Sequence, residues 1–204
     1  MTTSAPSPAT PSAPPIQRPQ LRFEPTRLPD VILVVPPRFG DERGYFCETY
    51  HRGKFDEGGI GVEFVQDNQS FSRPAGTLRG LHYQLPPRAQ DKLVRCLKGR
   101  ILDVAVDIRR GSPTFGQHVA VELTADGGEQ LFVPKGFAHG FATLEPECVV
   151  AYKCSDAYSP QHERGVAWDD PALEIDWQVD AASCLLSAKD RDNPVLAEQP
   201  DLFP

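Results

Sequence analysis

Three short segments of the chain carry side chains that could move protons. The segment Leu78 to Gln84 has a strand-like sequence and contains His82. The segment Lys92 to Arg95 places a lysine among apolar neighbours, where it could share a concave face with them. The segment Val133 to Phe141 has the pattern Pro-x-Gly-x-x-His, which ends at His139. Histidine is the commonest general acid or base, so the three segments indicate either proton transfer or metal binding.

Each segment also has a purely structural interpretation. A single histidine on a strand is usually a hydrogen-bonded structural residue, and an isolated lysine is usually a solvated surface charge. The turn from Pro134 to His139 could be a tight hairpin. Because a histidine, a lysine and several arginines accompany apolar strands in one half of the chain, coincidence becomes a weaker explanation, but these segments alone do not decide between the structural and the functional interpretation.

The Pro-x-Gly-x-x-His turn raises the possibility of a cupin. Metal-binding cupins have His-x-His and a downstream Glu before this turn. The corresponding segment here reads His82-Tyr83-Gln84, and no Glu follows at a suitable spacing before Gly99. A borderline metal needs three or four N, O or S donors, and two histidines fall short of that number. We therefore expect no metal.

The segments that must position these groups read mainly as short β-strands. Ile101 to Ile108 alternates, with Leu102, Val104, Val106 and Ile108 on one face. Further strands are predicted at Val31 to Val35, around Val119 to Leu123, and at Val149 to Cys154, whereas helical turns are expected only near Arg52 to Glu57 and the C-terminus. The 16 Gly and 21 Pro supply dense turn signals. The pattern predicts an all-β fold with few short helices, a β-sandwich or barrel in which a jelly roll is the leading choice, and the Pro-x-Gly-x-x-His turn favours the cupin type.

Composition excludes several classes of protein. The net charge of −7 is unlike that of a general nucleic-acid binder, and no apolar run is long enough to span a bilayer. The five cysteines form no CxxC pair, so reduced thiols in the cytoplasm are expected. Of the first 20 residues, 15 are Pro, Ser, Ala or Thr. We expect residues 1–20 to be a disordered extension and residues 21–204 to form a single cupin-like domain.

A series of motifs resembles the dTDP-4-dehydrorhamnose 3,5-epimerase family, the cupin-fold enzymes of the pathway to dTDP-L-rhamnose. The resemblance runs from about Val31 to Leu196. The motifs occur in order along the chain: Phe39 to Gly44, Phe64 to Asn68, Leu78 to Gln84, Lys92 to Cys96, Asp103 to Arg109, Ser112 to Gly116, Pro134 to Phe141, Tyr152-Lys153 and Leu186 to Asp190.

The resemblance implies a proton-transfer mechanism. A C4 ketone acidifies the hydrogens on C3 and C5, so epimerisation needs a base, a stabiliser of the enolate and an acid on the opposite face. His82 is implied as the base, oriented by Asp190. Lys92 is implied beside the enolate oxygen and Tyr152 as the proton donor. No cofactor is implied.

The resemblance also implies a substrate site and a homodimer. The substrate is expected to be a dTDP-4-keto-6-deoxy sugar, with Arg43 and Arg79 holding its diphosphate. Family members are homodimers in which N-terminal strands cross to the partner. Strict strand alternation would separate Arg79 from His82 unless the strand bends at Gly80. The remaining positions implied in nucleotide and sugar binding are Glu48, Gln66, Asp67, Asn68, His139, Glu163 and Lys189.

Two other functions remain open on the sequence. An epimerase that inverts only C3 or only C5, in a pathway to an antibiotic sugar, would keep the same fold and the same His82–Asp190 pair. A metal-binding or non-catalytic cupin is a different class, and the missing second histidine and Glu count against it.

Overall fold

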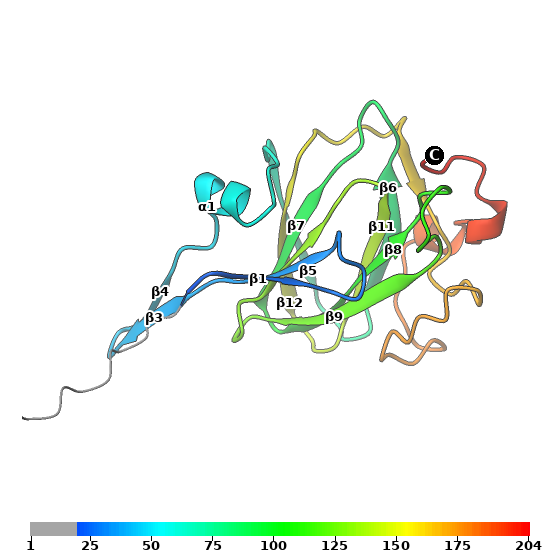
Figure 1. The fold of residues 1–204 in the computed structure, drawn as a ribbon. Helices are drawn as coiled ribbons and strands as arrows, with labels where there is room; N and C mark the ends of the chain where they lie inside the picture. The colour runs from blue at the N-terminus through cyan, green and yellow to red at the C-terminus, as the bar shows by residue number, and fades with distance from the viewer. Residues whose placement is uncertain (1–19) are drawn as a thin grey trace, which may run out of the picture.

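The structure is a computed structural model that describes residues 20–204, and these residues form mainly β-strands (Figure 1). The predicted extension of residues 1–20 lies outside the described residues, apart from Gln20, which is exposed. No helix in the described part of the chain is long and apolar enough to cross a membrane.

The strands form two larger antiparallel sheets and one hairpin. The six-stranded sheet has the order β1-β2-β10-β7-β12-β5, and the five-stranded sheet has the order β13-β6-β11-β8-β9. Strands β3 and β4 pair only with each other. The bounds are β1 Arg22–Pro25, β2 Ile32–Val35, β3 Arg38–Asp41, β4 Gly44–Cys47, β5 Gln66–Ser72, β6 Leu78–Gln84, β7 Lys92–Lys98, β8 Arg100–Asp107, β9 His118–Thr124, β10 Gln130–Val133, β11 Phe137–Thr143, β12 Cys148–Cys154 and β13 Glu163–Gly165.

The predicted all-β jelly roll is confirmed by these two sheets. Helices are short: α1 Arg52–Glu57, α2 Ala188–Arg191 and the 3-10 turn Leu196–Glu198. The helical turns expected from the sequence near Arg52 and near the C-terminus are therefore present. The segment from Pro134 to Gly136 joins β10 of one sheet to β11 of the other, so it is a crossover between sheets and not a hairpin.

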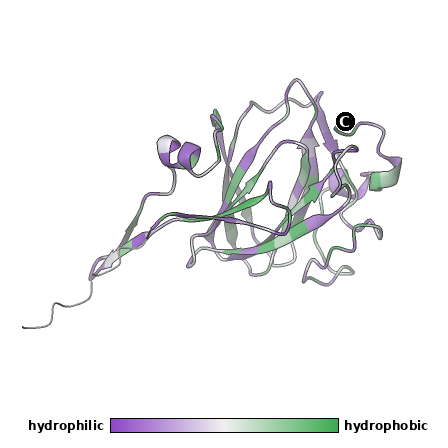
Figure 2. Ribbon diagram, viewed as in Figure 1, coloured by the Kyte–Doolittle hydropathy of each residue, from purple (hydrophilic) through white to green (hydrophobic). Residues whose placement is uncertain are grey.

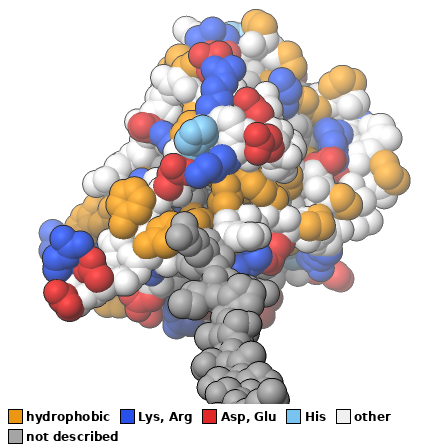
Figure 3. Space-filling model, turned by 60° about the vertical axis from the view of Figure 1, so that its left-hand side comes forward, with side chains coloured by type: hydrophobic (Ala, Val, Ile, Leu, Met, Phe, Trp, Pro, Cys, Tyr) orange, Lys and Arg blue, Asp and Glu red, His pale blue; other side chains and the backbone are white. Residues whose placement is uncertain are grey.

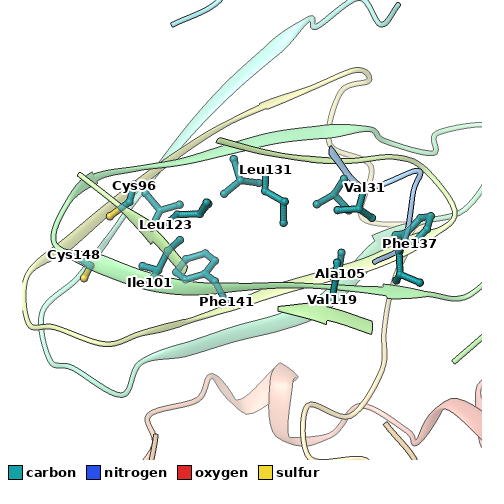
Figure 4. Close-up of a cluster of buried hydrophobic side chains, with 14 residues drawn as sticks. Val31, Cys96, Ile101, Ala105, Val119, Leu123, Leu131, Phe137, Phe141 and Cys148 are labelled. Carbon is teal, nitrogen blue, oxygen red and sulfur yellow. The ribbon is translucent and has the colours of Figure 1, made fainter. Parts of the chain in front are cut away.

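A hydrophobic core fills one part of the space between the two sheets. Figure 4 shows side chains such as Leu131, Ile101 and Phe141 pointing toward one another from opposite sheets. Hydrophobic residues concentrate in the strands of the sandwich (Figure 2). Burial of this apolar surface is the main force that holds the sheets together.

Strand β8 is buried on both of its faces. Ile101 and Ala105 point into the core between the sheets, whereas Leu102 and Val104 belong to a second cluster. This second cluster includes residues of the C-terminal segment, among them Trp177. The predicted alternation of β8 is therefore correct, and the C-terminal segment covers the face that would otherwise meet water.

The β3–β4 hairpin projects away from the sandwich (Figure 1). Its aromatic side chains Phe39, Tyr45 and Phe46 are exposed. Hydrophobic side chains gather next to charged ones on this side of the molecule (Figure 3). Three exposed aromatic residues on a short hairpin are typical of a surface that another chain covers.

Candidate active site

A polar cavity lies between the two sheets, next to the hydrophobic core. The cavity has two adjoining parts, and the larger part has a volume of about 340 Å³. Both parts are lined by His82 from β6, Lys92 from β7 and Tyr152 from β12. His82 belongs to the five-stranded sheet, and Lys92 and Tyr152 belong to the six-stranded sheet. The sandwich therefore brings the predicted base, cation and phenol to one space from opposite walls.

His82 forms a close pair with Asp190 of helix α2. His82 Nε2 lies 2.5 Å from Asp190 Oδ1, and the Asp190 side chain is only 3% exposed. The N-cap residue Ser187 donates from Oγ to Asp190 Oδ2 at 2.8 Å and accepts from the Asp190 backbone N–H. Burial opposes ionisation of Asp190, but the hydrogen bonds from His82 and Ser187 outweigh it and lower the pKa of Asp190. An ionised Asp190 accepts a hydrogen bond from Nε2–H of His82, which leaves Nδ1 of His82 as a proton acceptor.

The bend expected at Gly80 is present. Gly80 has a φ of +122°, which favours glycine, and a Cβ there would lie 2.6 Å from the Cα of Gly140. The pairing of β6 with β11 shifts register at this point. As a result Arg79 and His82 line the same part of the cavity, which regular alternation would prevent.

Lys92 and Tyr152 project from neighbouring strands of one sheet. Tyr152 pairs with Val94 and Cys154 pairs with Lys92, so both side chains lie on the inner face of β7 and β12. Burial lowers the pKa of Lys92, because the charged form loses its hydration. Burial raises the pKa of Tyr152 for the same reason, which keeps the phenol protonated at neutral pH.

His139 forms a second buried histidine–aspartate pair. Its Nε2 lies 2.8 Å from Oδ1 of Asp103, which is fully buried on β8. His139 faces His82 across the β6–β11 pairing and lines the same part of the cavity. The structure thus supports its predicted place as a polar residue of the site.

Glu163 and Lys189 meet at the edge of the cavity. Lys189 Nζ lies 2.5 Å from Glu163 Oε2, and the Tyr158 hydroxyl donates to the same oxygen at 2.6 Å. Burial opposes ionisation of Glu163, but these two hydrogen bonds prevail and lower its pKa. Gln66 and Asn68 line the cavity from β5.

Three predicted binding residues do not line this cavity within the single chain. Arg43 lies at the turn of the β3–β4 hairpin, is 84% exposed and pairs with Asp41. Glu48 pairs with Lys54 at 2.6 Å outside the sandwich. Asp67 projects from the outer face of β5, where it pairs with Lys153. Strand alternation places Asp67 on the face of β5 opposite to the face that carries Gln66 and Asn68. The sequence prediction treats the three adjacent residues as one binding group and does not take this alternation into account.

The described residues contain no group of three or more His, Cys, Asp or Glu side chains that could hold a metal ion. His82 and His139 are each already paired with a carboxylate. The geometry suits proton transfer between groups on opposite walls of a cavity.

Comparison with known proteins identifies the family. The family model described as dTDP-4-dehydrorhamnose 3,5-epimerase matches residues 25–198. The chain belongs to this family. The dTDP-4-dehydrorhamnose 3,5-epimerase of Pseudomonas aeruginosa is 51% identical over 178 residues, which is 87% of this chain and 96% of that protein.

Solved structures agree with this assignment to the dTDP-4-dehydrorhamnose 3,5-epimerase family. The dTDP-6-deoxy-D-glucose-3,5-epimerase of Legionella pneumophila, in complex with dTDP-4-keto-L-rhamnose, is 44% identical with a TM-score of 0.84 and covers 88% of this chain and 94% of its own. ChmJ, a 3′-monoepimerase from Streptomyces bikiniensis in complex with dTDP-quinovose, is 34% identical with a TM-score of 0.79. The match covers 85% of this chain and 87% of the ChmJ chain. The fold is the cupin-type jelly roll of these epimerases.

The sequence did not indicate every polar residue that lines the cavity. Tyr158 lies outside the predicted motifs, and its contacts with Glu163 and Gln66 place it at the cavity. Ser70 was missed because serine on a strand has no distinctive spacing, although it follows Asn68 by two positions and so shares its face. Asp103 stands within a predicted motif, but its pairing with His139 depends on how β8 and β11 align.

Proposed function

We propose that this chain is a cofactor-independent isomerase, a dTDP-4-dehydrorhamnose 3,5-epimerase. The observation that carries the proposal is the His82–Asp190 pair, which faces Lys92 and Tyr152 across one cavity. Membership of the family and the ligand of the Legionella relative, dTDP-4-keto-L-rhamnose, support the substrate class, a dTDP-4-keto-6-deoxy sugar.

The proposed reaction begins with proton abstraction next to the C4 ketone. Nδ1 of His82 takes the proton from carbon, and the electron pair of the C–H bond moves into the enolate while Asp190 stabilises the imidazolium. The ammonium of Lys92 stabilises the enolate oxygen, an interaction that strengthens as negative charge develops there.

Tyr152 completes the inversion in this mechanism. Its phenol donates a proton to the same carbon from the opposite face, and the raised pKa of the buried phenol favours its reprotonation afterwards. Because the ketone of the substrate accepts the electron pair, the exchange of one proton for another requires no external electron sink.

The decisive experiment is incubation of dTDP-4-keto-6-deoxyglucose with the protein in D₂O. Deuterium at C3 and C5, read separately, and a product that an added dTDP-4-ketorhamnose reductase consumes are the expected results. Absence of exchange at both carbons contradicts the proposal.

A monoepimerase is the second candidate, since ChmJ shares the fold at 34% identity. A monoepimerase would keep the same His82–Asp190 pair and fold, because the outcome depends on how long the intermediate remains in the cavity and changes ring conformation. Deuterium at only one carbon, with inversion at that carbon alone, would establish this function instead.

We further propose that the enzyme is a homodimer and that Arg43 and Glu48 act in the partner's cavity. Both lie outside the cavity of their own chain, and the hairpin that carries Arg43 projects with exposed aromatic residues. A local arginine at the diphosphate is needed, since the net charge of the chain is −7. Arg79, which lines the cavity, would supply the second guanidinium.

A complementation experiment tests this arrangement. Arg43→Ala and His82→Ala variants are each expected to be weakly active or inactive, and mixed dimers of the two should regain activity. One cavity of a mixed dimer then contains both an intact His82 and the Arg43 of the other subunit. If Arg43 serves its own chain, no cavity of the mixed dimer is complete and mixing restores nothing.

We also propose a cytoplasmic protein with one epimerase domain over residues 21–204. All five cysteines are free thiols, as expected in a reducing compartment. No general affinity for nucleic acid is expected of a chain with a net charge of −7. Limited proteolysis should leave residues 21–204 as the resistant fragment.

A further inference from the structure

The inner face of strand β5 presents a row of polar side chains to the cavity. Gln66 accepts the Tyr158 backbone N–H at 3.0 Å and donates to Asn68 at 3.0 Å. At the other end of the strand, Ser72 accepts from Nε of Arg79 at 3.3 Å. These polar groups are therefore held by the protein itself.

Ser70 is different from its neighbours on this face. Among the described residues, its Oγ is one of a few buried side-chain polar atoms with no hydrogen-bond partner. Buried hydroxyls nearly always have a partner, since an unpaired one loses hydration without compensation. Ser70 lines the same part of the cavity as His82, Lys92 and Tyr152. The missing partner is therefore expected on the ligand side.

We propose that Ser70 is a specificity residue that binds a hydroxyl group of the sugar ring. The inference rests on the proposed function, because it takes a dTDP-linked sugar as the ligand. The ketone oxygen is the group that develops negative charge, and the cation of Lys92 suits it better than a neutral hydroxyl does. A serine hydroxyl can both donate and accept, which matches the dual capacity of a sugar hydroxyl.

The conformation of Ser70 allows this contact. Its Oγ is enclosed by protein, while the residue as a whole is only partly buried and lines the cavity. Serine has three staggered positions about its Cα–Cβ bond, and the proposed contact uses the one that turns the hydroxyl toward the cavity. Leaving its position breaks no hydrogen bond, because Oγ has none to lose.

Calorimetric titration of Ser70→Ala with two ligands tests the proposal. The first ligand is dTDP-6-deoxyglucose, which carries ring hydroxyls but no ketone, and the second is dTDP, which carries no sugar. Loss of one neutral hydrogen bond should weaken the affinity for the sugar nucleotide by roughly three- to tenfold. The affinity for dTDP should stay within about twofold of the wild-type value. Equal binding of dTDP-6-deoxyglucose to Ser70→Ala and to the wild-type chain overturns the proposal.

Ser72→Ala is the matched control on the same face of β5. Because the Ser72 hydroxyl accepts a hydrogen bond from Arg79, its removal should change the affinities for the two ligands by the same factor. If Ser72→Ala also weakens only the affinity for the sugar nucleotide, the effect of Ser70→Ala is explained by altered packing of β5, and the proposal is wrong. If the wild-type chain binds neither ligand, the proposed function fails together with the Ser70 role. Wild-type binding without a Ser70 effect refutes the Ser70 role alone.

Discussion

His82 Nε2 lies 2.5 Å from Oδ1 of Asp190, although the two residues stand 108 positions apart in the sequence. The pair joins a strand of the five-stranded sheet to a four-residue helix near the C-terminus. Folding of the C-terminal segment onto the sheet is therefore required before the base is oriented. The proposed chemistry depends on this contact more than on any other.

Replacement of His82 by Ala should remove the base. We expect the rate to fall by about two to four orders of magnitude, because general base catalysis contributes on that scale. The measurement is the initial rate of the reductase-coupled assay. Circular dichroism checks the fold, and a normally folded variant with activity within a few-fold of the wild type contradicts the assignment.

Asp190→Asn should reduce the rate less than His82→Ala does, since the imidazole remains but loses its anionic partner. The pH dependence gives a second measurement. Because the folded-state pKa of Asp190 is lowered, the ionised form persists below the pH at which an ordinary aspartate is protonated, and the contribution of Asp190 to the rate is lost only as pH falls through that lowered pKa. A variant with the same rate as the wild type would show that Asp190 is not needed.

Tyr152→Phe should separate proton abstraction from inversion. The ring is retained, so substrate affinity should change little, whereas turnover should fall because the donor on the opposite face is missing. His82 can still take and return protons on its own face, so deuterium should enter from D₂O without inversion. NMR of the recovered sugar reads both events. Normal epimerisation, or no exchange at all, is incompatible with two catalytic groups on opposite faces.

The charge of Lys92 should set the alkaline limit of activity. Burial lowers the pKa of Lys92, so the ammonium is lost at a lower pH than the ordinary lysine value of 10.5. The kcat/KM profile should therefore decline as pH rises through this lowered pKa. Lys92→Arg should shift the decline to higher pH, because a guanidinium stays charged. An unchanged alkaline limb in Lys92→Arg assigns the limb to another group.

Much of the fold could be predicted from the sequence because its signals are local. Alternation in Ile101 to Ile108 predicted β8, and Gly80 indicated the bend that lets Arg79 and His82 share a cavity. These features depend on the pleat of one strand or the backbone of one residue.

Contacts between distant segments could not be predicted from the residues alone. The pairing of Asp103 with His139 requires the register of β8 against β11. The separation of Arg43 from the cavity depends on the direction of a hairpin whose strands pair with neither sheet of the chain. The unpaired hydroxyl of Ser70 emerges only when all its neighbours are placed.

The enzyme should retain full activity after dialysis against a strong chelator. His82-Tyr83-Gln84 lacks the second histidine of a metal site, and the chain has no G-x-G-x-x-G dinucleotide motif. Absorbance spectra and metal analysis of the purified protein accompany the assay. Activity that disappears on chelation and returns with one particular divalent ion would overturn the mechanism and make His139 a candidate ligand.

Arg43 and Arg79 should each contribute to binding of the diphosphate. Charge-assisted hydrogen bonds are worth about 1.5–3 kcal/mol each. Loss of the planar guanidinium fork in Arg43→Lys or Arg79→Lys should therefore weaken the binding of dTDP by about tenfold or more. Calorimetry with dTDP measures the change. Arg22→Lys is the matched control, because Arg22 is an exposed arginine that pairs with Glu24. If both variants bind dTDP as tightly as Arg22→Lys does, the diphosphate lies elsewhere and neither arginine holds it.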